Sequence, residues 1–531
     1  MFMKKIRRGL LLLSAVILSN SIQAQNLPDI NRQMAKFGQT LMYLNSYYLD
    51  TVNTNTLTEN AINSVISKLD PHSAYISAKD VKAMNEPLEG NFDGVGIEFA
   101  IIKDTLSVAA PIAGGPCERV GILTGDRIVQ VDGETIAGTG LTNERVHKYL
   151  RGPKGTKVQL GIVRKGVTGM LHFEVVRDKI PINSLDAAYE VDKGVYYLKL
   201  SRFAQNSSNE ILEALIGMKA ERINGIILDL RGNTGGFLGT AMEISNFFLE
   251  GGQSIVYTEG LKSPKRIERA TGAGFYKKGP LVVMIDENSA SASEIVAGAI
   301  QDWDRGVIVG RRSFGKGLVQ QIMPLNDGSQ LRLTIARYHT PSGRVIQSPY
   351  EVGESEKYYK SFVERYAKGE MFSKDSISFP DSLKYKTLVK GRTVYGGGGI
   401  MPDIFVPADT SYYSEYYMNL IRRGIINEFM TNLGDQNRAV WSTKYKTFEQ
   451  FEKNFRIDEK ILGDLTQFAV NKSLPLDSKG LETSKTEMAI VMKALAAKTI
   501  FGNTAYYRVI NSERDATFAK AMEVIRSKDG L

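Results

Sequence analysis

The chain has 531 residues, of which 43% are hydrophobic and 24% are charged, and its formal net charge is +9. This composition is ordinary for folded globular protein and excludes disorder, while the length calls for roughly three or four structural units. Lysine and arginine are scattered among acids rather than clustered, so we expect neither a nucleic-acid partner nor an anionic-membrane partner.

Residues 1–24 have the pattern of a secretory signal peptide. An apolar run at residues 10–18 follows four basic residues and leads to a polar end that closes at Ala24. Cleavage after Ala24 would remove four positive charges, lower the net charge from +9 to +5 (9 − 4), and leave an exported, periplasmic protein. An uncleaved inner-membrane anchor is the alternative, although the apolar run is shorter than the about 20 residues that span a bilayer.

Residues 25–85 are predicted to be mainly helical. Apolar residues recur at helical spacing, which is typical of a segment that packs or forms a homo-oligomer: Met34, Phe37, Leu41 and Leu44. A polar turn follows at residues 70–73, and His72 beside a proline is expected to be a turn residue rather than a catalytic base.

Cysteine and histidine are too sparse to predict a disulfide or a metal centre. Cys117 is the single cysteine, which rules out an intramolecular disulfide. The four histidines lie far apart in sequence: His72, His147, His172 and His339. We therefore expect no metal site and no cofactor.

Residues 86–180 change to short β-rich runs punctuated by glycine and proline. Gly94, Val95, Gly96 and Ile97 lead into one such run, and Gly-Asp-Arg-Ile-Val-Gln-Val-Asp-Gly follows at residues 125–133. This pattern resembles a PDZ domain of the bacterial, circularly permuted kind. The resemblance implies that residues 94–97 receive a peptide's C-terminal carboxylate and that the peptide adds as a strand along residues 97–101. A small β module without a ligand is the alternative.

Residues 181–410 alternate strands and helices, which predicts an α/β core with a mostly parallel sheet. The predicted strands cover residues 194–200, 225–230, 281–285 and 307–309, with helices between them. Two polar turns follow strands: Asp-Leu-Arg-Gly-Asn-Thr-Gly-Gly at residues 229–236, and Ser-Ala-Ser-Ala-Ser-Glu at 289–294. Sites in such sheets lie beyond the C-terminal ends of the strands, where both turns fall. A charged insertion occupies residues 350–392, a last strand is expected near 404–406, and residues 411–531 form a helical extension.

Ser291 permits two interpretations. It begins a predicted helix with Glu294 three residues later, which is the pattern of a capping box. A serine at a strand-to-helix turn also lies near free backbone N–H groups that can stabilise an oxyanion. The two interpretations are compatible.

Lys316 stands 25 residues after Ser291, between Gly315 and Gly317. A lysine can serve as the base for a serine nucleophile where burial lowers its pKa. Residues 310–316 also match the first seven positions of a P-loop, but Gly317 replaces the hydroxyl residue that holds magnesium, and the following residues read as extended. A Ser-His-Asp triad using His339 is a further alternative, but His339 looks like a strand residue.

The motifs at 229–236 and 289–294, Phe-Gly-Lys-Gly at 314–317 and Thr-Pro-Ser-Gly-Arg at 340–344 occur in the order seen in the C-terminal processing peptidases. The chain resembles this family of tail-specific Ser/Lys proteases (family S41) over roughly residues 60–350 and the strand near 400. The resemblance implies that Ser291 is the nucleophile, Lys316 the general base and Gln320 the residue that orients the lysine. It also implies an oxyanion hole of backbone N–H groups from Gly235 or Gly236 and from Ala292.

Several further residues are expected to support this site. Asp302 matches an acidic position of the family, and Arg151 matches a position through which the PDZ module communicates with the active site. A scaffolding role is expected for three residues of the glycine loop: Asp229, Arg231 and Asn233.

The sequence therefore predicts a multi-domain α/β protein: a protease core with an inserted PDZ-like module (86–180) and helical segments at both ends. The expected function is that of an exported serine endopeptidase that captures C-terminal tails of proteins and cleaves through an acyl-enzyme. The expected partners are protein or peptide substrates, with an adaptor protein as a further expectation. The alternative is a catalytically inactive PDZ-bearing binding or scaffold protein of the same fold.

Overall fold

The computed structural model describes residues 29–218 and 223–527. The predicted signal peptide at residues 1–24 lies outside the described residues. None of the helices among the described residues has the length and apolar character needed to cross a bilayer.

A six-stranded sheet forms the centre of the molecule, in the order β10-β11-β12-β15-β16-β21. The five strands from β11 to β21 are parallel, and β10 is an antiparallel edge. The strand bounds are Leu185–Asp192 (β10), Val195–Leu200 (β11), Gly225–Asp229 (β12), Leu281–Ile285 (β15), Val307–Gly310 (β16) and Ile404–Phe405 (β21). Side chains alternate between the two faces of the sheet, and both faces are buried, which explains the continuous apolar runs of these strands.

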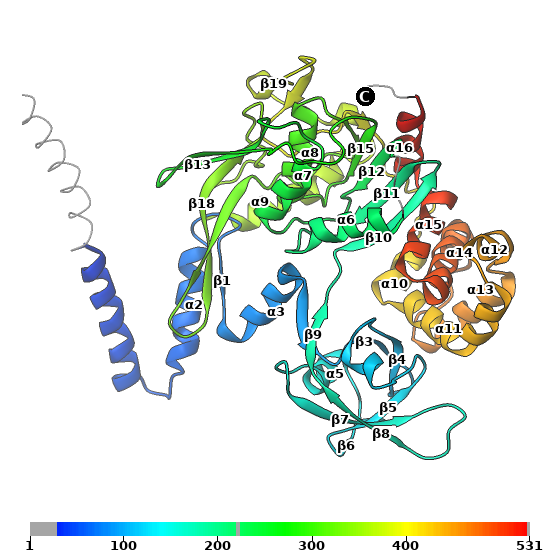
Figure 1. Ribbon diagram of the computed structural model, residues 1–531. Coiled ribbons are helices and arrows are strands. Elements are labelled where there is room, and N and C mark those ends of the chain that lie inside the picture. The colour runs from blue at the N-terminus through cyan, green and yellow to red at the C-terminus, as the bar shows by residue number, and fades with distance from the viewer. Residues whose placement is uncertain (1–28, 219–222, 528–531) are drawn as a thin grey trace, which may run out of the picture.

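Helices cover both faces of this sheet (Figure 1). One face packs against α6 (Ser207–Gly217), α7 (Leu238–Asn246) and α8 (Ala292–Asp302). The other face packs against α16 (Ala516–Ser527), which contributes Phe518, Met522 and Ile525 to the core. The last helix of the predicted C-terminal extension is therefore part of the core's packing. The predicted α/β core is confirmed.

A second, antiparallel sheet lies beside the core, in the order β1-β18-β13-β14, with β17 also paired to β18. Its strands are β1 (Ala74–Ile76), β13 (Ser254–Gly260), β14 (Ser263–Arg269), β17 (Leu318–Pro324) and β18 (Gln330–His339). The N-terminal segment is mainly helical, and the short strand β1, which was not predicted, lies between α2 (Thr54–Ile66) and α3 (Ala78–Glu89). The short alternation at residues 74–76 is hard to distinguish from a helical turn. Residues 344–347, which resemble a strand in sequence, form only an isolated bridge, His339 to Val345.

The β-rich module is connected to the core by a two-stranded neck, which consists of β2 (Asn91–Gly94) and β9 (Asp178–Pro181) (Figure 1). Its sheet has the order β3-β4-β5-β7-β8, with β6 (Glu134–Thr135) paired to β5. The other strands are β3 (Ile97–Ile101), β4 (Leu106–Pro111), β5 (Arg127–Val131), β7 (Lys157–Val163) and β8 (Leu171–Val176). Helices α4 (Pro116–Arg119) and α5 (Asn143–Leu150) complete it, and Cys117 is buried in its core.

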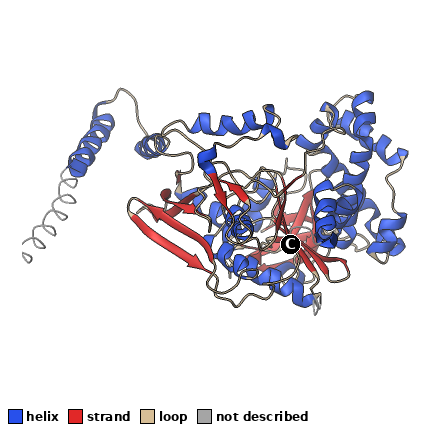
Figure 2. Cartoon of the chain, turned by 90° about the horizontal axis from the view of Figure 1, so that it is seen from above, coloured by secondary structure: helices blue, strands red, loops and turns tan. Residues whose placement is uncertain are grey.

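The insertion after β18 contains α9 (Ser355–Ala367), two short 3-10 turns (Lys374–Ser376 and Asp381–Leu383) and a hairpin of β19 (Lys384–Lys386) and β20 (Thr393–Tyr395). A helical bundle with its own apolar core follows. Its helices are α10 (Glu415–Arg422), α11 (Ile425–Lys444), α12 (Phe448–Asn454), α13 (Glu459–Asn471), α14 (Ser478–Phe501) and α15 (Asn503–Glu513). Figure 2 shows this bundle on the opposite side of the molecule from the first described helix, residues 29–47.

Candidate active site

The two polar turns that follow β12 and β15 meet at one edge of the core sheet. These strands are parallel neighbours, so their C-terminal ends coincide. The Asn233 carbonyl oxygen accepts hydrogen bonds from the Ala290 N–H at 3.0 Å and from the Ser293 hydroxyl at 2.8 Å. The glycine loop and the serine turn are therefore joined directly.

Ser291 has a strained backbone at the start of α8. Its dihedral angles are φ 56° and ψ −112°, whereas an ordinary N-cap residue is extended. A non-glycine residue in such a region costs on the order of 1–3 kcal/mol and is held there by its surroundings. The Ser291 N–H donates to the Glu294 carboxylate at 2.8 Å, which supplies one contact of the predicted capping box. Ser291 is thus a helix cap held in a strained conformation.

The glycine loop approaches Ser291 so closely that a side chain would not fit. A Cβ atom on Gly235, where φ is +105°, would lie 2.8 Å from Ser291 Cβ and 3.0 Å from the Ala292 nitrogen. At Gly236, where φ is +152°, a Cβ would overlap the Phe203 carbonyl oxygen. Gly235 therefore allows the loop backbone to lie against the serine, and Gly236 allows it to lie against the Phe203 backbone.

The backbone N–H groups of this pocket are only partly used. The Gly235 N–H donates to Asn233 Oδ1 at 2.9 Å, so it is already occupied. Among the described residues, the N–H groups of Gly236 and Ala292 have no acceptor. Of the residues predicted for the oxyanion hole, Gly236 and Ala292 therefore keep an N–H without an acceptor in the described part of the chain.

The Asp229 and Arg231 side chains hold the base of the loop. Asp229 is fully buried and accepts from Arg231 at 2.7 Å, from Tyr197 at 2.7 Å and from Lys199 at 3.3 Å. Burial alone would raise the pKa of this carboxyl, but Arg231 and Lys199 together hold it below its usual value. Arg231 also pairs at 2.6 Å with Asp515, which lies just before α16. These contacts are those of a scaffold.

Lys316 reaches the same edge from the loop between β16 and β17. Its N–H donates to Glu294 Oε2 at 2.9 Å, and the carboxylate that receives it also accepts from the Ser291 N–H. The Tyr338 hydroxyl lies within hydrogen-bonding reach of the Ser291 carbonyl oxygen, at 3.2 Å, and of the Lys316 carbonyl oxygen. The backbones of the two predicted catalytic residues are therefore held by common partners.

The Lys316 ammonium nitrogen donates to Gln320 Oε1 at 3.2 Å. The Gln320 amide in turn donates to the His72 carbonyl oxygen, which fixes its orientation. Within the described part of the chain, no hydrogen bond joins the Ser291 and Lys316 side chains.

The surroundings of Lys316 favour its neutral form. Burial lowers the pKa of Lys316, and the Arg332 guanidinium lowers it further, while Glu294 and Asp70 oppose the change. Burial, together with the positive charge of Lys316, lowers the pKa of His72 to about 4, so the imidazole is neutral near pH 7. A lysine with a lowered pKa is the form that can accept a proton from a hydroxyl.

Three other predicted residues lie away from Ser291. Asp302, at the other end of α8, is fully buried and binds Arg344 at 2.5 Å, which anchors the turn at residues 340–344. Arg151 pairs with Glu86 of α3 at 2.5 Å, next to the neck of the β module. His339 stacks on Tyr257 with ring centroids 4.4 Å apart, so the structure does not bring it to the serine.

The predicted peptide-binding segment leads into an edge strand. Strand β3 pairs with β4 on one side and, among the described residues, with no strand on the other. Gly96 has φ 77°, and residues 95 and 96 connect the end of β2 at Gly94 to the start of β3 at Ile97. The arrangement fits the addition of a peptide strand beside β3.

Two contributors to the site could not be recognised as such from sequence. Glu294 matches a capping box, but its carboxylate also accepts from Ser313 Oγ at 2.6 Å and from the Gly315 N–H at 2.7 Å. His72 looks like a turn residue, yet its carbonyl oxygen holds Gln320, 248 positions away. The only local feature of the sequence that indicates an ordered turn is Asp70, two residues before His72. In the structure its carboxylate accepts the His72 N–H at 2.9 Å.

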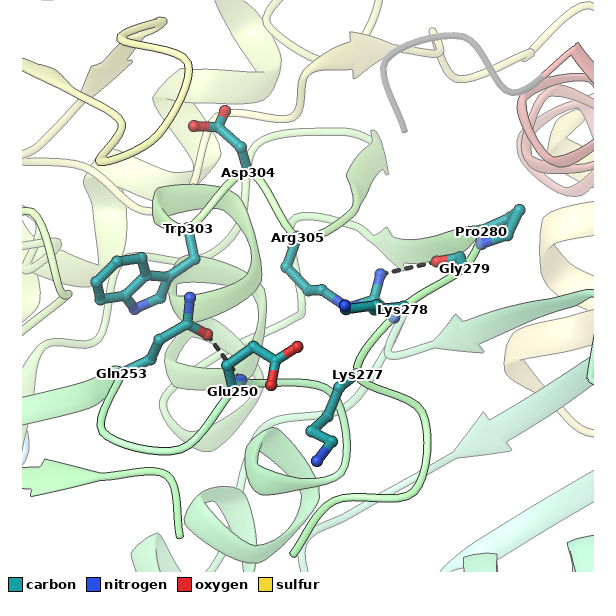
Figure 3. A pocket seen from close by; sticks show the side chains of 9 residues that line it. All are labelled: Glu250, Gln253, Lys277, Lys278, Gly279, Pro280, Trp303, Asp304 and Arg305. Atoms are coloured by element: carbon teal, nitrogen blue, oxygen red, sulfur yellow. Dashed lines mark hydrogen bonds between the residues drawn. The ribbon is translucent and has the colours of Figure 1, made fainter. Parts of the chain in front are cut away.

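A cavity of about 480 Å³ lies at the far end of α8 and includes Trp303 and Arg305 (Figure 3). Arg305 donates to the Gly279 carbonyl oxygen at 2.9 Å, and the Gln253 amide oxygen accepts the Glu250 N–H at 2.9 Å. The 11 residues of α8 span about 16 Å, so this cavity is separate from the Ser291 site.

Three family models match separate parts of the chain. The model of peptidase family S41 matches residues 194–352, a PDZ domain model matches residues 107–164, and a family of unknown function (DUF8443) matches residues 416–502. These matches cover parts of the core, the β module and the helical bundle, respectively.

Curated relatives match a larger share of the chain than any of these models. The carboxy-terminal-processing protease of Bartonella bacilliformis is 38% identical over 340 residues, which are 63% of this chain and 77% of that protein. The carboxy-terminal processing protease CtpB of Bacillus subtilis is 33% identical over 327 residues, which are 61% and 67% of the two chains. The solved structure of a photosystem II D1 C-terminal processing protease has 25% identity and a TM-score of 0.36, covering 70% of this chain and 86% of that one. The chain therefore belongs to the carboxy-terminal processing serine proteases of peptidase family S41 and carries a PDZ domain.

Proposed function

We propose that the chain is an exported serine endopeptidase that captures a protein's C-terminal tail on its PDZ domain and cleaves upstream with a Ser291/Lys316 dyad. The observation that carries the proposal is the junction at Glu294, whose carboxylate accepts from the N–H groups of both residues. A buried carboxylate with such partners fixes the spacing of two backbone segments that are 25 positions apart in sequence.

The chemistry follows from the groups at this junction. Neutral Lys316 Nζ accepts the proton of Ser291 Oγ while the oxygen attacks the peptide carbonyl carbon. The N–H groups of Gly236 and Ala292, which have no acceptor among the described residues, are the proposed donors to the resulting oxyanion. The Lys316 ammonium then gives the proton to the leaving amine, and an acyl-enzyme forms. Water hydrolyses the acyl-enzyme, with Lys316 again accepting the proton.

Gln320 has the role of holding Lys316. Its Oε1 accepts from Lys316 Nζ, and its amide is tied to the His72 carbonyl. Lys316 Nζ donates to Gln320 Oε1, and we propose that substrate binding brings Nζ onto Ser291 Oγ. The wider roles of Asp229, Arg231, Asn233 and Asp302 are to support the loop and α8.

Tail capture is proposed for the turn at residues 94–97 and the open edge of β3. Backbone N–H groups of a glycine-containing turn suit a carboxylate, and an extended tail can add as a strand beside β3. Arg151, bound to Glu86 near the neck, is proposed to link the PDZ domain to the core. Export to the periplasm and oligomerisation through the terminal helical segments remain part of this proposal.

The test uses an unfolded substrate with a defined tail, offered with a free C-terminal carboxylate or with a C-terminal amide. Ser291→Ala and Lys316→Ala are each expected to abolish cleavage, while Lys278→Ala, an exposed lysine on the far side of the core, keeps it. The amidated substrate is expected to lose tail-dependent cleavage. Normal turnover by both dyad variants would refute the dyad, and equal cleavage of both substrates would refute tail capture.

A further inference from the structure

The insertion after β18 is in direct contact with the loop that carries Lys316. Phe362 of α9 stacks on Phe314 with ring centroids 4.0 Å apart and planes 10° from parallel. Arg365 of the same helix donates to the Ser313 carbonyl at 3.0 Å and to the Arg312 carbonyl at 3.1 Å. Helix α9 therefore covers the residues that immediately precede Lys316.

The Tyr358 hydroxyl of α9 lies between the side chains of His72 and Gln347. Tyr358 is only 2% exposed, and its hydroxyl lies 3.2 Å from His72 Nε2 and 3.3 Å from Gln347 Nε2. The Gln347 amide donates to the Tyr358 hydroxyl, and the direction of the Tyr358–His72 hydrogen bond depends on the His72 tautomer.

Both hydrogen-bond partners of Tyr358 also contact residues next to Lys316 or bound to it. Gln347 Oε1 accepts the N–H of Gly317, the residue after Lys316, at 2.8 Å. The His72 carbonyl accepts the amide of Gln320, whose Oε1 accepts from Lys316 Nζ at 3.2 Å. The Tyr358 hydroxyl thus closes a set of hydrogen bonds around the proposed general base.

A second contact ties α9 to the turn that contains His72. The Tyr359 hydroxyl donates to the Pro71 carbonyl at 2.8 Å, and the Tyr358 ring meets the His72 ring edge-on at a centroid distance of 5.2 Å. The segment around residues 70–73 therefore lies between α9 and β18, where Thr334 donates to Asp70 at 2.9 Å.

We infer that α9 is a working part of the active site and that Tyr358 is a positioning residue, acting through His72 and Gln347 to hold Lys316 and Gln320. The inference rests on the proposed Ser291/Lys316 dyad. It assigns a catalytic purpose to the insertion at residues 350–392, which has no counterpart in the family pattern seen from the sequence.

The test is the pH dependence of kcat/KM for the full-length chain carrying Tyr358→Phe. Loss of the hydroxyl frees His72 and Gln347 and admits water to Lys316, which faces Arg332, Glu294, Asp70 and His72. We expect kcat/KM at neutral pH to fall about tenfold. The increase in kcat/KM that follows deprotonation of Lys316 is expected to shift by about one pH unit to higher pH. Thermal unfolding and KM for the peptide are measured in parallel.

Tyr366→Phe is the matched control, because Tyr366 lies on the same helix but is 58% exposed. A purely structural role for Tyr358 would lower the amount of folded enzyme without moving the pH profile. An unchanged profile in Tyr358→Phe would overturn the inference, whether or not the variant is less stable.

A double-mutant cycle with His72→Phe shows whether Tyr358 acts through His72. We expect the double variant to lose about as much kcat/KM as either single variant, since both break the same contact. Multiplied losses would contradict this route. Failure of the proposed dyad would give a different result, namely full activity in Lys316→Ala. If Tyr358→Phe does not fold, the pH profile of His72→Phe tests the inference instead.

Discussion

The carboxylate of Glu294 and the backbone N–H of Lys316 are joined by a hydrogen bond of 2.9 Å, although the two residues lie on different elements. The same carboxylate accepts from the Ser291 N–H, the Ser313 hydroxyl and the Gly315 N–H. Glu294 is fully buried, and its carboxylate accepts four hydrogen bonds. It therefore sets the position of the lysine loop relative to the serine turn.

Glu294→Gln is expected to lower kcat by at least about 100-fold, because an amide places a donor against N–H groups that need an acceptor. Binding of a tail peptide to the PDZ domain should not change. Steady-state kinetics and peptide titration separate the two. Glu364→Gln is the control, because it makes the same substitution at an exposed position. Unchanged kcat in Glu294→Gln would contradict the junction.

The same residue makes stability depend on pH. Burial raises the pKa of Glu294 from 4.5 to about 7, so the folded chain holds this proton more tightly than the unfolded chain. The stability that comes from this proton is fully present below pH 4.5 and is lost as the pH rises through about 7. The free energy of unfolding of the natural chain minus that of Glu294→Gln is expected to fall by up to about 1.4 kcal/mol per pH unit in this window. Urea unfolding across the window measures this difference, and a constant value would contradict the raised pKa.

Gly235→Ala is expected to abolish activity. Its Cβ would lie 2.8 Å from Ser291 Cβ at a backbone φ of +105°, which displaces the serine turn. We expect a loss in kcat/KM of at least about 100-fold and a cost in the free energy of unfolding of about 1–3 kcal/mol. Gly239→Ala is the matched control, because nothing lies within 4 Å of a Cβ added there, in the first turn of α7. Full activity in Gly235→Ala would refute the close approach.

Asp515→Asn tests the contact between the C-terminal segment and the glycine loop. Asp515 pairs with Arg231 at 2.6 Å and also accepts the Phe518 N–H at 2.9 Å at the start of α16. Asparagine keeps that cap but removes the charge, so we expect a loss in stability of about 1–3 kcal/mol and a kcat reduced several-fold.

Asp192→Asn is the comparison for Asp515→Asn, since its pair with Arg526 is largely exposed. Its expected effect on the free energy of unfolding is within about 0.5 kcal/mol. Chemical denaturation and steady-state kinetics measure both variants. Equal effects of the two substitutions would show that the Arg231 contact does not support the loop.

The local patterns in the sequence were sufficient to predict the strands of the core sheet and the polar turns that follow them. The apolar runs of β11, β12, β15 and β16 are buried on both faces, and the motifs at residues 229–236 and 289–294 follow them directly. Parallel neighbours bring such turns together, so their meeting was predictable. Strand β14 was not, because its exposed, charged residues give no apolar alternation.

The supports of the site depend on contacts between distant parts of the chain. Nothing near residue 72 indicates that its carbonyl meets Gln320, and nothing near residue 358 indicates that a tyrosine of the insertion meets His72. Likewise, Asp515 follows a helical bundle that shows no chemical motif, yet it reaches Arg231. Such contacts are set by tertiary packing, which a single sequence does not encode in a local pattern.

The central claim is that Ser291 is a nucleophile activated by Lys316. The most direct measurement is the rate at which an electrophilic serine-directed phosphonate labels the full-length chain between pH 6 and pH 11, with the labelled residue identified by mass spectrometry. The account predicts label on Ser291 alone, a rate that rises with a midpoint below 10.5, the ordinary lysine pKa, and loss of this labelling in Lys316→Ala. Label on another serine, or equal labelling of Ser291 in Lys316→Ala, would contradict it.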